Sequence, residues 1–186
     1  MSPGRRTPVG LVIGSTDSMA LPSSSPLKLL AELLELDQVS RERRASWSLA
    51  QRQRRQVICT DLRAWALARQ VAPEGAEQRR DPRAPMRIRV QLLGGPRPVE
   101  LQSESLAVGG LSATLHFAPR KGDLMALRLI PPAPEAPLEL MGEVVWYDAR
   151  KARAGLRFKD PNDEAKSVLE RIVFGELVRN AARDPG

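Results

Sequence analysis

Three arginines, Arg79, Arg80 and Arg83, stand close together in the stretch EQRRDPRAP. A guanidinium group presents a planar fork of N–H donors that matches phosphate oxygens, or the O6 and N7 edge of guanine, two bonds at a time. Pro82 and Pro85 restrict the backbone beside the arginines, which lowers the conformational entropy that binding must remove. The stretch predicts an anion-binding loop, and the alternative is a solvated basic loop at a domain boundary.

Other kinds of chemistry find little support in the residue types. The chain has one cysteine, Cys59, and one histidine, His116. This excludes an internal disulfide and a Cys/His zinc site, and it argues against a histidine-based triad. We find no nucleophile–base pair, metal set or phosphate loop, so we do not expect an enzyme. Cys59 is expected in helix packing or as a free thiol, and His116 on the outer face of a strand.

The overall charge suggests an anionic partner. The 186 residues carry a formal charge of +7, which suits a nucleotide, a nucleic acid or a membrane surface. No apolar run approaches the roughly 20 residues of a membrane span, so we expect no such span. The lone cysteine fits a reducing compartment, and we expect a cytoplasmic protein that begins with a flexible segment.

The region after the arginines has the two-residue hydrophobic period of β-strands. Short alternating stretches such as MRIRVQL, LSATLHF and AGLRF are separated by turn signals, and six such strands predict a small antiparallel β-barrel. The residues expected to point inward include Met86, Ile88, Val90, Leu92, Leu111, Ala113, Leu115, Phe117, Leu138, Leu140, Val144, Trp146, Ala154, Leu156 and Phe158.

Helices are predicted on both sides of this barrel. After it, Asp160 is expected to cap a helix whose first position is Pro161. The apolar stripe of that helix is Ala165, Val168, Leu169, Ile172 and Val173.

Before the barrel, one helix is expected to start at Pro26, with Leu30, Leu33, Leu34 and Asp37 on one face. A second is expected from near Ser40 to about Gln70, and its apolar face contains Ile58, Leu62, Trp65, Ala66 and Arg69.

These elements predict four regions along the chain. They are a flexible N-terminus (1–25), a helical region (26–70), a linker (71–78) and a β-barrel domain with its C-terminal helix (79–180). The two N-terminal helices could pair as a hairpin, but a hairpin this small buries little surface by itself. We therefore expect it to pack on the barrel domain or on a second copy of the chain.

The order of these elements resembles the PilZ family, whose members are mostly receptors for the bacterial second messenger cyclic di-GMP. The resemblance covers about residues 77–175. The family's first motif, R-x-x-x-R in the loop before the barrel, matches the stretch from Arg79 to Arg83, and GEVVWY and AGLRF look like PilZ strands. The resemblance implies a mainly β fold with helices: a six-stranded antiparallel PilZ-like barrel. It also implies a cyclic di-GMP site and no resident cofactor.

The family's second motif, [D/N]-x-S-x-x-G, is only partly present. It falls on SLAVGG, where Gly110 matches, Ser105 replaces the acid or amide, and Ala107 replaces the serine. Two weakened ligand contacts cost about 2–4 kcal/mol, or roughly 30- to 1000-fold in affinity. The ligand-binding residues that the resemblance implies are Arg79, Arg80, Arg83, Ser105, Gly109 and Gly110.

Three functions therefore remain open from the sequence. The first is a non-catalytic cyclic di-GMP receptor. The second is a PilZ-type adaptor that binds the nucleotide weakly or not at all and acts through protein contacts or self-association of the N-terminal helices. The third is nucleic-acid binding by the basic stretch 41–55, which we do not expect, because its arginines are scattered around the helix.

Overall fold

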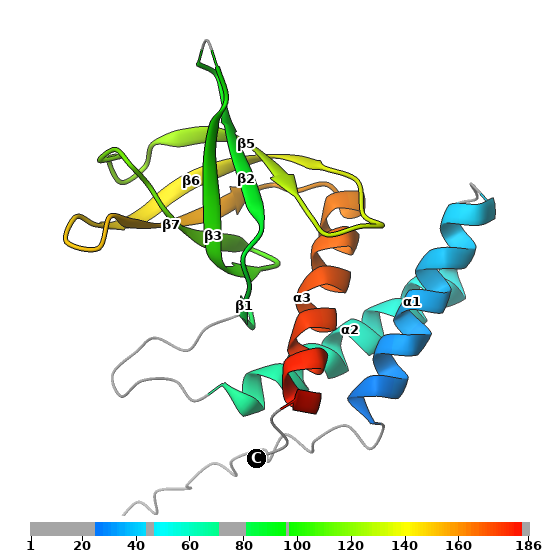
Figure 1. Cartoon of the computed structure of the whole chain (residues 1–186). Helices are drawn as coiled ribbons and strands as arrows, with labels where there is room; N and C mark the ends of the chain where they lie inside the picture. Colours follow the sequence, from blue (N-terminus) through cyan, green and yellow to red (C-terminus); the bar gives the residue numbers. More distant parts are fainter. Residues whose placement is uncertain (1–24, 44–46, 71–80, 96, 184–186) are drawn as a thin grey trace, which may run out of the picture.

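The structure is a computed structural model that describes residues 25–43, 47–70, 81–95 and 97–183. The expected linker and, apart from Ser25, the expected flexible N-terminus lie outside these residues. Helices α1 (Pro26–Arg43) and α2 (Leu49–Arg69) precede the strands, and helix α3 (Asp163–Arg183) follows them. Figure 1 shows the barrel beside the first half of α3, α1 on the other side of α3, and α2 crossing the second half of α3.

The strands form a closed, six-stranded antiparallel β-barrel, as predicted. Strands β2 to β7 pair in the order β3-β2-β5-β6-β7-β4, and β4 pairs with β3 to close the circle. The two-residue strand β1 pairs with the end of β3. The strands are β1 (Ala84–Pro85), β2 (Arg89–Leu93), β3 (Val99–Ala107), β4 (Gly110–Thr114), β5 (Leu124–Ile130), β6 (Leu138–Asp148) and β7 (Arg153–Lys159).

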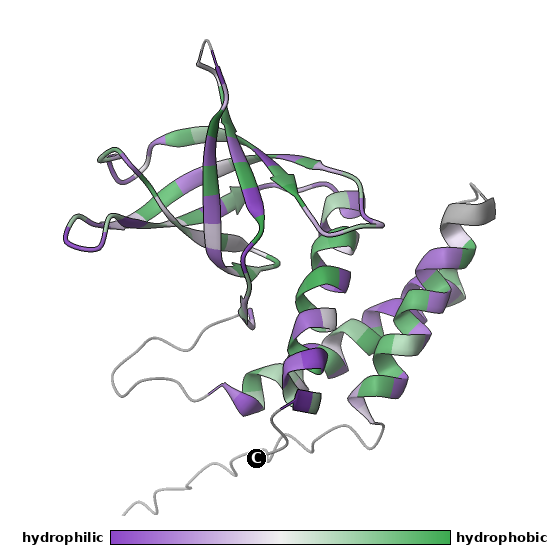
Figure 2. Cartoon of the chain, viewed as in Figure 1, coloured by the Kyte–Doolittle hydropathy of each residue, from purple (hydrophilic) through white to green (hydrophobic). Residues whose placement is uncertain are grey.

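The alternation of the sequence becomes the inside and the outside of the barrel. Val90, Leu127 and Leu156 are among the residues that fill its interior, while Arg87 and Arg89 are exposed. Hydrophobic and hydrophilic residues alternate along the strands in Figure 2. Because successive side chains of a strand point to opposite faces, the predicted inward residues are mostly the ones that are buried.

Two aromatic residues depart from this expectation. Trp146 was predicted inward but is 40% exposed. The pairing of β6 with β7 shifts between Val144 and Trp146, so Val145 is an extra residue on β6. A β-bulge of this kind reverses the alternation beyond it, and Tyr147 packs against the core instead of Trp146.

Phe117 was also predicted inward and is 41% exposed. The reason is that β4 ends at Thr114, so the strand alternation no longer controls where Phe117 points. His116 is exposed, as expected.

The C-terminal helix starts later than predicted. The side-chain oxygen of Asn162 accepts a hydrogen bond from the Ala165 amide at 2.8 Å, so Asn162 is the N-cap. Asp160 does not cap the helix and has a φ of 42°. The predicted stripe from Ala165 to Val173 is correct, and its five residues belong to the barrel core.

The two N-terminal helices pack on the outer half of α3. Helix α2 begins at Leu49 rather than near Ser40, because Ser48 and Gln51 form a capping box. Leu34, predicted on the packed face of α1, is 43% exposed. A second hydrophobic core joins the three helices and contains Leu29, Leu33, Ile58, Cys59, Leu62, Phe174 and Val178.

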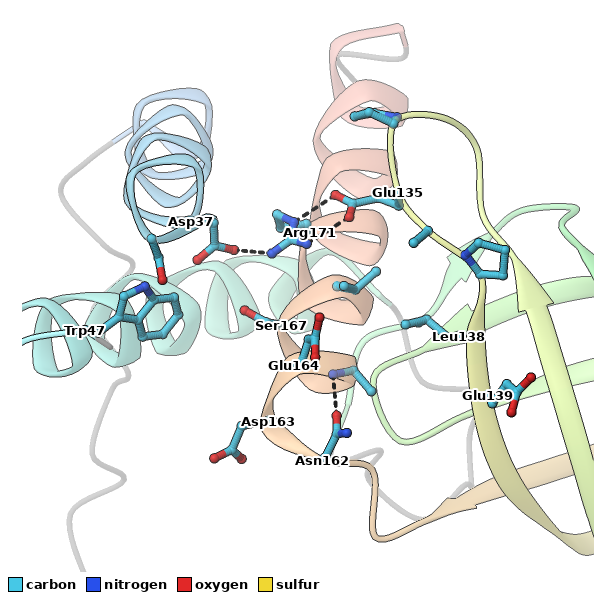
Figure 3. A pocket seen from close by; sticks show the side chains of 16 residues that line it. Asp37, Trp47, Glu135, Leu138, Glu139, Asn162, Asp163, Glu164, Ser167 and Arg171 are labelled. Atoms are coloured by element: carbon cyan, nitrogen blue, oxygen red, sulfur yellow. Dashed lines mark hydrogen bonds and ion pairs between the residues drawn. The ribbon is translucent and has the colours of Figure 1, made fainter. Parts of the chain in front are cut away.

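A buried arginine connects the barrel to the helices at the edge of this second core. The side chain of Arg171 on α3 is 6% exposed. It donates to Asp37 on α1 at 2.6 Å and, through two nitrogens, to Glu135 in the β5–β6 loop at 2.9 Å. Figure 3 shows Arg171 between the two carboxylates. Burial alone would lower the pKa of Arg171, but the bonds to Glu135 and Asp37 raise it.

A second arginine extends the same network to α2. Arg55 donates to Asp37 at 3.0 Å and to Ser167 at 2.7 Å, and it pairs with Glu170 at 2.7 Å. Cys59 is a buried free cysteine, as expected. Burial, followed by the nearby Glu170 carboxylate, raises the pKa of its thiol to about 12. The network therefore ties all three helices to one loop of the barrel.

We predict that Arg171→Met lowers the free energy of unfolding by about 3–5 kcal/mol, because it leaves buried carboxylates without their partner. The measurement is urea denaturation followed by circular dichroism. Arg54→Met is the matched control, since Arg54 forms a similar two-nitrogen pair with Glu32 on the surface and exposed pairs contribute little. Equal destabilisation by both variants would contradict the assigned importance of the buried network.

Candidate ligand-binding site

One cavity beside the end of strand β3 brings together residues that suit an anionic, aromatic ligand. Its volume is about 390 Å³, and it is lined by Arg83, Pro85, Ser105, Ser112, Trp146 and Arg153. These residues come from the segment before β2 and from strands β3, β4, β6 and β7. Two of them, Arg83 and Ser105, are predicted site residues.

The position of Arg83 is set from two sides. Its neighbour Pro85 pairs with Ser105 across β1 and β3. The side-chain amide of Gln70, at the C-terminal cap of α2, accepts from the Arg83 backbone N–H at 3.1 Å and donates to the Arg83 carbonyl at 2.7 Å. The backbone that carries this guanidinium is therefore held both by the barrel and by the end of α2.

The same segment lies against the β3–β4 turn. Asp81 pairs with Arg63 of α2 at 3.4 Å. A Cβ atom at Gly109 would come within 2.9 Å of the Asp81 carboxylate, so Gly109 leaves room for this side chain. Gly109 therefore packs against the segment that carries Asp81 and Arg83, but it does not line the cavity.

Two serine hydroxyls meet on the floor of the cavity. The Oγ atoms of Ser105 and Ser112 lie 2.8 Å apart, at hydrogen-bond distance. Ser112 stands between the inward residues Leu111 and Ala113 and so points to the other face of β4, yet it is 3% exposed, because it lies beside Ser105 where β3 and β4 pair. The pair offers hydroxyl groups at the place where the family motif has a carboxylate or an amide.

Arg153 is the second guanidinium of the cavity, and it was not predicted from the sequence. It forms an ion pair with Glu104, which also accepts from Thr114 at 3.2 Å. The Nε atom of Arg153 is buried and has no hydrogen-bond partner among the described residues. Only the pairing of β4 with β7 brings Arg153 near Ser112, so spacing along the chain gave no signal of it.

Trp146 forms a flat apolar wall of the cavity. Its indole lies so close over Gly155 that a Cβ atom at that position would overlap the ring. A glycine inside a strand often marks such a close approach. Gly155 is therefore the one residue of the stretch AGLRF that could have indicated a side chain packed against this strand. The bulge at Val145 turns the ring outward, so Trp146 lines the cavity instead of packing in the core.

Several predicted site residues do not line the cavity. A Cβ atom at Gly110 would overlap the backbone oxygen of Leu156, so this glycine is needed for the pairing of β4 with β7. Ala107, at the serine position of the motif, is 4% exposed and also does not line the cavity. Arg79 and Arg80 lie outside the described residues.

A larger hollow of about 750 Å³ lies between the helices and the β5–β6 loop, and Figure 3 shows its lining. Its lining includes five carboxylate residues, and its one arginine, Arg171, is already bonded to Asp37 and Glu135. An anionic ligand would meet mainly like charge there. The smaller cavity is therefore the better candidate for the ligand that the arginines predict.

The described residues show few other functional features. They contain no group of three or more His, Cys, Asp or Glu residues placed to hold a metal ion. Among the described helices, none combines the length and the apolar character needed to cross a bilayer. The arrangement offers two guanidinium groups, an indole face and two hydroxyls, which together suit phosphate and a planar base.

A closed six-stranded barrel with a C-terminal helix, preceded by an arginine-bearing segment, defines a small β-barrel domain. The model of the PilZ domain family matches residues 77–175, and the chain belongs to this family. PilZ domains are generally non-catalytic regulatory domains, and the family comprises receptors and adaptors of cyclic di-GMP. No curated protein sequence matches the chain.

Solved structures with a similar fold share little sequence with the chain. The inhibitor of motility MotI (DgrA) from Bacillus subtilis is 15% identical, with a TM-score of 0.48 over 63% of this chain and 59% of MotI. The PilZ domain of YcgR from Escherichia coli, solved with c-di-GMP, is 16% identical, with a TM-score of 0.46 over 59% of this chain and 98% of that domain. A tetrameric PilZ protein from Xanthomonas campestris, self-assembled through a helical bundle, is 19% identical, with a TM-score of 0.37 over 88% and 82% of the two chains.

We predict that Gly110→Ala lowers the free energy of unfolding by about 1–3 kcal/mol, because the added methyl group pushes β4 away from β7. Thermal or urea denaturation measures the change. The control is Gly175→Ala within α3, where a Cβ atom meets nothing within 4 Å and the better helix propensity raises stability by about 0.5–1 kcal/mol. A Gly110→Ala protein as stable as the wild type would contradict the close approach of Gly110 to the Leu156 backbone.

Proposed function

We propose that the protein is a non-catalytic regulatory protein that binds cyclic di-GMP in the cavity formed by Arg83, Ser105, Ser112, Trp146 and Arg153. The observation that carries this proposal is the meeting of two arginines and a tryptophan in one cavity of a PilZ barrel. The nucleotide would be a regulatory ligand, and the residues described contain no machinery for changing it chemically.

Each wall of the cavity suits one part of this ligand. The guanidinium groups of Arg83 and Arg153 match the phosphates and the O6 and N7 edge of guanine. The exposed face of Trp146 suits a stacked base, a contact that is worth about 1–3 kcal/mol. The paired hydroxyls of Ser105 and Ser112 can donate to or accept from the polar edge of the ligand. Arg79 and Arg80 are proposed to add further positive charge.

A ligand bound by Arg83 would alter the contact between this residue and the end of helix α2. Gln70 binds both backbone polar groups of Arg83 and belongs to the cap of α2. A shift of Arg83 toward a bound phosphate would therefore strain or break this amide contact. We propose that the nucleotide signal passes from the cavity to α2 by this route, and that the helical region then acts on a protein partner or on a second copy of the chain.

The adaptor function is the second candidate, and the departures from the second motif favour it. Ser105 has a shorter reach than Asp or Asn, and its hydroxyl already lies against that of Ser112. Ala107 supplies no polar atom. In this alternative the barrel is a scaffold, and the protein works through contacts of its helices with or without the nucleotide.

Nucleic-acid binding by the stretch 41–55 is the weakest of the three candidates. Arg54 is bonded to Glu32, and Arg55 is bonded to Asp37 and Glu170 within the protein. These two arginines are therefore engaged in holding the helices together.

Cytoplasmic localisation remains part of the proposal, since a receptor of an intracellular second messenger works there.

The direct test of the receptor function is isothermal titration of the full chain with cyclic di-GMP. We expect binding by the wild type and a loss of about 10- to 150-fold in affinity for Arg83→Ala, because charged hydrogen bonds are removed. Trp146→Ala should weaken binding about tenfold or more through lost stacking.

Arg89→Ala is the control, since Arg89 is exposed on β2 and does not line the cavity. Absence of binding by the wild type would overturn the receptor function. Equal affinities of the Arg83→Ala and Arg89→Ala proteins would show that the nucleotide binds elsewhere.

The adaptor alternative is tested by restoring the second motif with Ser105→Asp and Ala107→Ser together. A carboxylate at position 105 can accept from the Ser112 hydroxyl and from a guanine edge, so affinity should rise about 10-fold or more over the wild type. Titration of both proteins side by side measures this gain. Binding that appears only in the restored protein would assign the natural protein to the adaptors.

A further inference from the structure

Helix α1 has a second apolar side that the fold leaves uncovered. Leu29 and Leu33 are buried in the helical core. On the other side, Leu27 is 60% exposed and Leu34 is 43% exposed. Leu30, between them, is only partly buried. We refer to Leu27, Leu30 and Leu34 as the outer stripe of α1. An exposed apolar stripe of this length on a helix is typical of a contact surface.

A groove continues the outer stripe toward the barrel. It has a volume of about 260 Å³ and lies between α1, α3 and the loop that follows β5. Its apolar lining includes Leu30, Leu34, Pro132, Ala133, Pro134, Ile172 and Gly175. The groove widens the apolar surface beside α1 and offers space for side chains of a second helix.

Charged residues along one flank of the stripe indicate which helix would fit. Lys28 and Glu35 are both exposed, carry opposite charge, and lie seven residues apart, so they occupy the same flank of the helix. No ion pair joins either of them to another described residue. With Leu27 and Leu34 at the d positions of a heptad, Lys28 and Glu35 fall at the e positions, and Ala31 provides a small residue at a.

We propose that α1 pairs with α1 of a second copy of this chain, antiparallel and about a two-fold axis near the middle of the helix. In an antiparallel pair of helices, e positions face e positions, so Lys28 of each copy would lie beside Glu35 of the other. A two-fold interface uses the same surface on both copies, and the outer stripe is complementary to itself in this way. A parallel pair would instead place Leu30 opposite Glu35, without any match of charge.

The proposed function leaves the partner of the helical region open, and this pairing identifies that partner as a second copy of the chain. The pairing does not depend on the nucleotide. Arg171 also lines the groove, but it is already bonded to Asp37 and Glu135 within one copy. The new contact would therefore add to the fold of each copy without rearranging it. The cavity at Arg83 lies on the barrel side of the molecule and stays open in the pair.

The test is analytical ultracentrifugation of the full chain without nucleotide over a range of concentrations. We expect a monomer–dimer equilibrium. Leu27→Asp should raise the dissociation constant of the dimer about tenfold or more, because an apolar contact is replaced by a charge. Asp suits the first turn of a helix, so α1 should still fold. The matched control is Leu124→Asp on the barrel, where the leucine is 63% exposed and the dimer should be unchanged.

A charge exchange tests the antiparallel register itself. Lys28→Glu and Glu35→Lys should each weaken the dimer about three- to tenfold, since each places like charges together. The double variant should restore the wild-type dissociation constant. A monomeric wild type at all concentrations, a dimer sensitive to Leu124→Asp, or a double variant weaker than both single variants would overturn the proposal. Nucleotide titration of the same proteins keeps this outcome separate from the receptor function.

Discussion

A single buried guanidinium, that of Arg171, governs how the two halves of this molecule fit together. Its charge is paired only when Glu135 of the β5–β6 loop and Asp37 of α1 both lie beside it. Apolar contacts tolerate small shifts, whereas a buried ion pair with a misplaced partner is strongly unfavourable. The network thus restricts the helices to one arrangement against the barrel, and Arg55 applies the same restriction to α2.

The candidate ligand site depends on that arrangement. With α2 held by Arg55, its C-terminal cap lies where Gln70 can bind the backbone of Arg83. The other walls of the cavity belong to the barrel alone. One side of the site is therefore set by the docking of helices and the other by strand pairing. In the proposed function, this division is what couples the ligand to elements outside the barrel itself.

The parts of the structure that follow from local patterns could be predicted from the sequence. Ile88 and Val90 alternate with arginines, and this pattern correctly predicts that both are buried. The apolar residues at helical spacing on α3 likewise predict the face of that helix that packs on the barrel. The position of Trp146 could not be predicted, because a bulge depends on the partner strand. Arg153 and Ser112 enter the cavity through pairings between strands that are distant in sequence. The Arg171 network joins residues more than a hundred positions apart, and no local pattern contains it.

The extra residue Val145 has a consequence for how such barrels diverge. If β6 lost the bulge and kept Val145, Val145 would pair with Gly155 and Trp146 with Ala154, so the tryptophan would point inward and Tyr147 outward, while every pairing before the bulge stayed the same. Gain or loss of the aromatic wall therefore requires only a one-residue shift in the pairing of β6 with β7, with no substitution in the cavity. Among related barrels, the presence or absence of this bulge would separate those that present a stacking surface from those that do not, even where their arginines are identical.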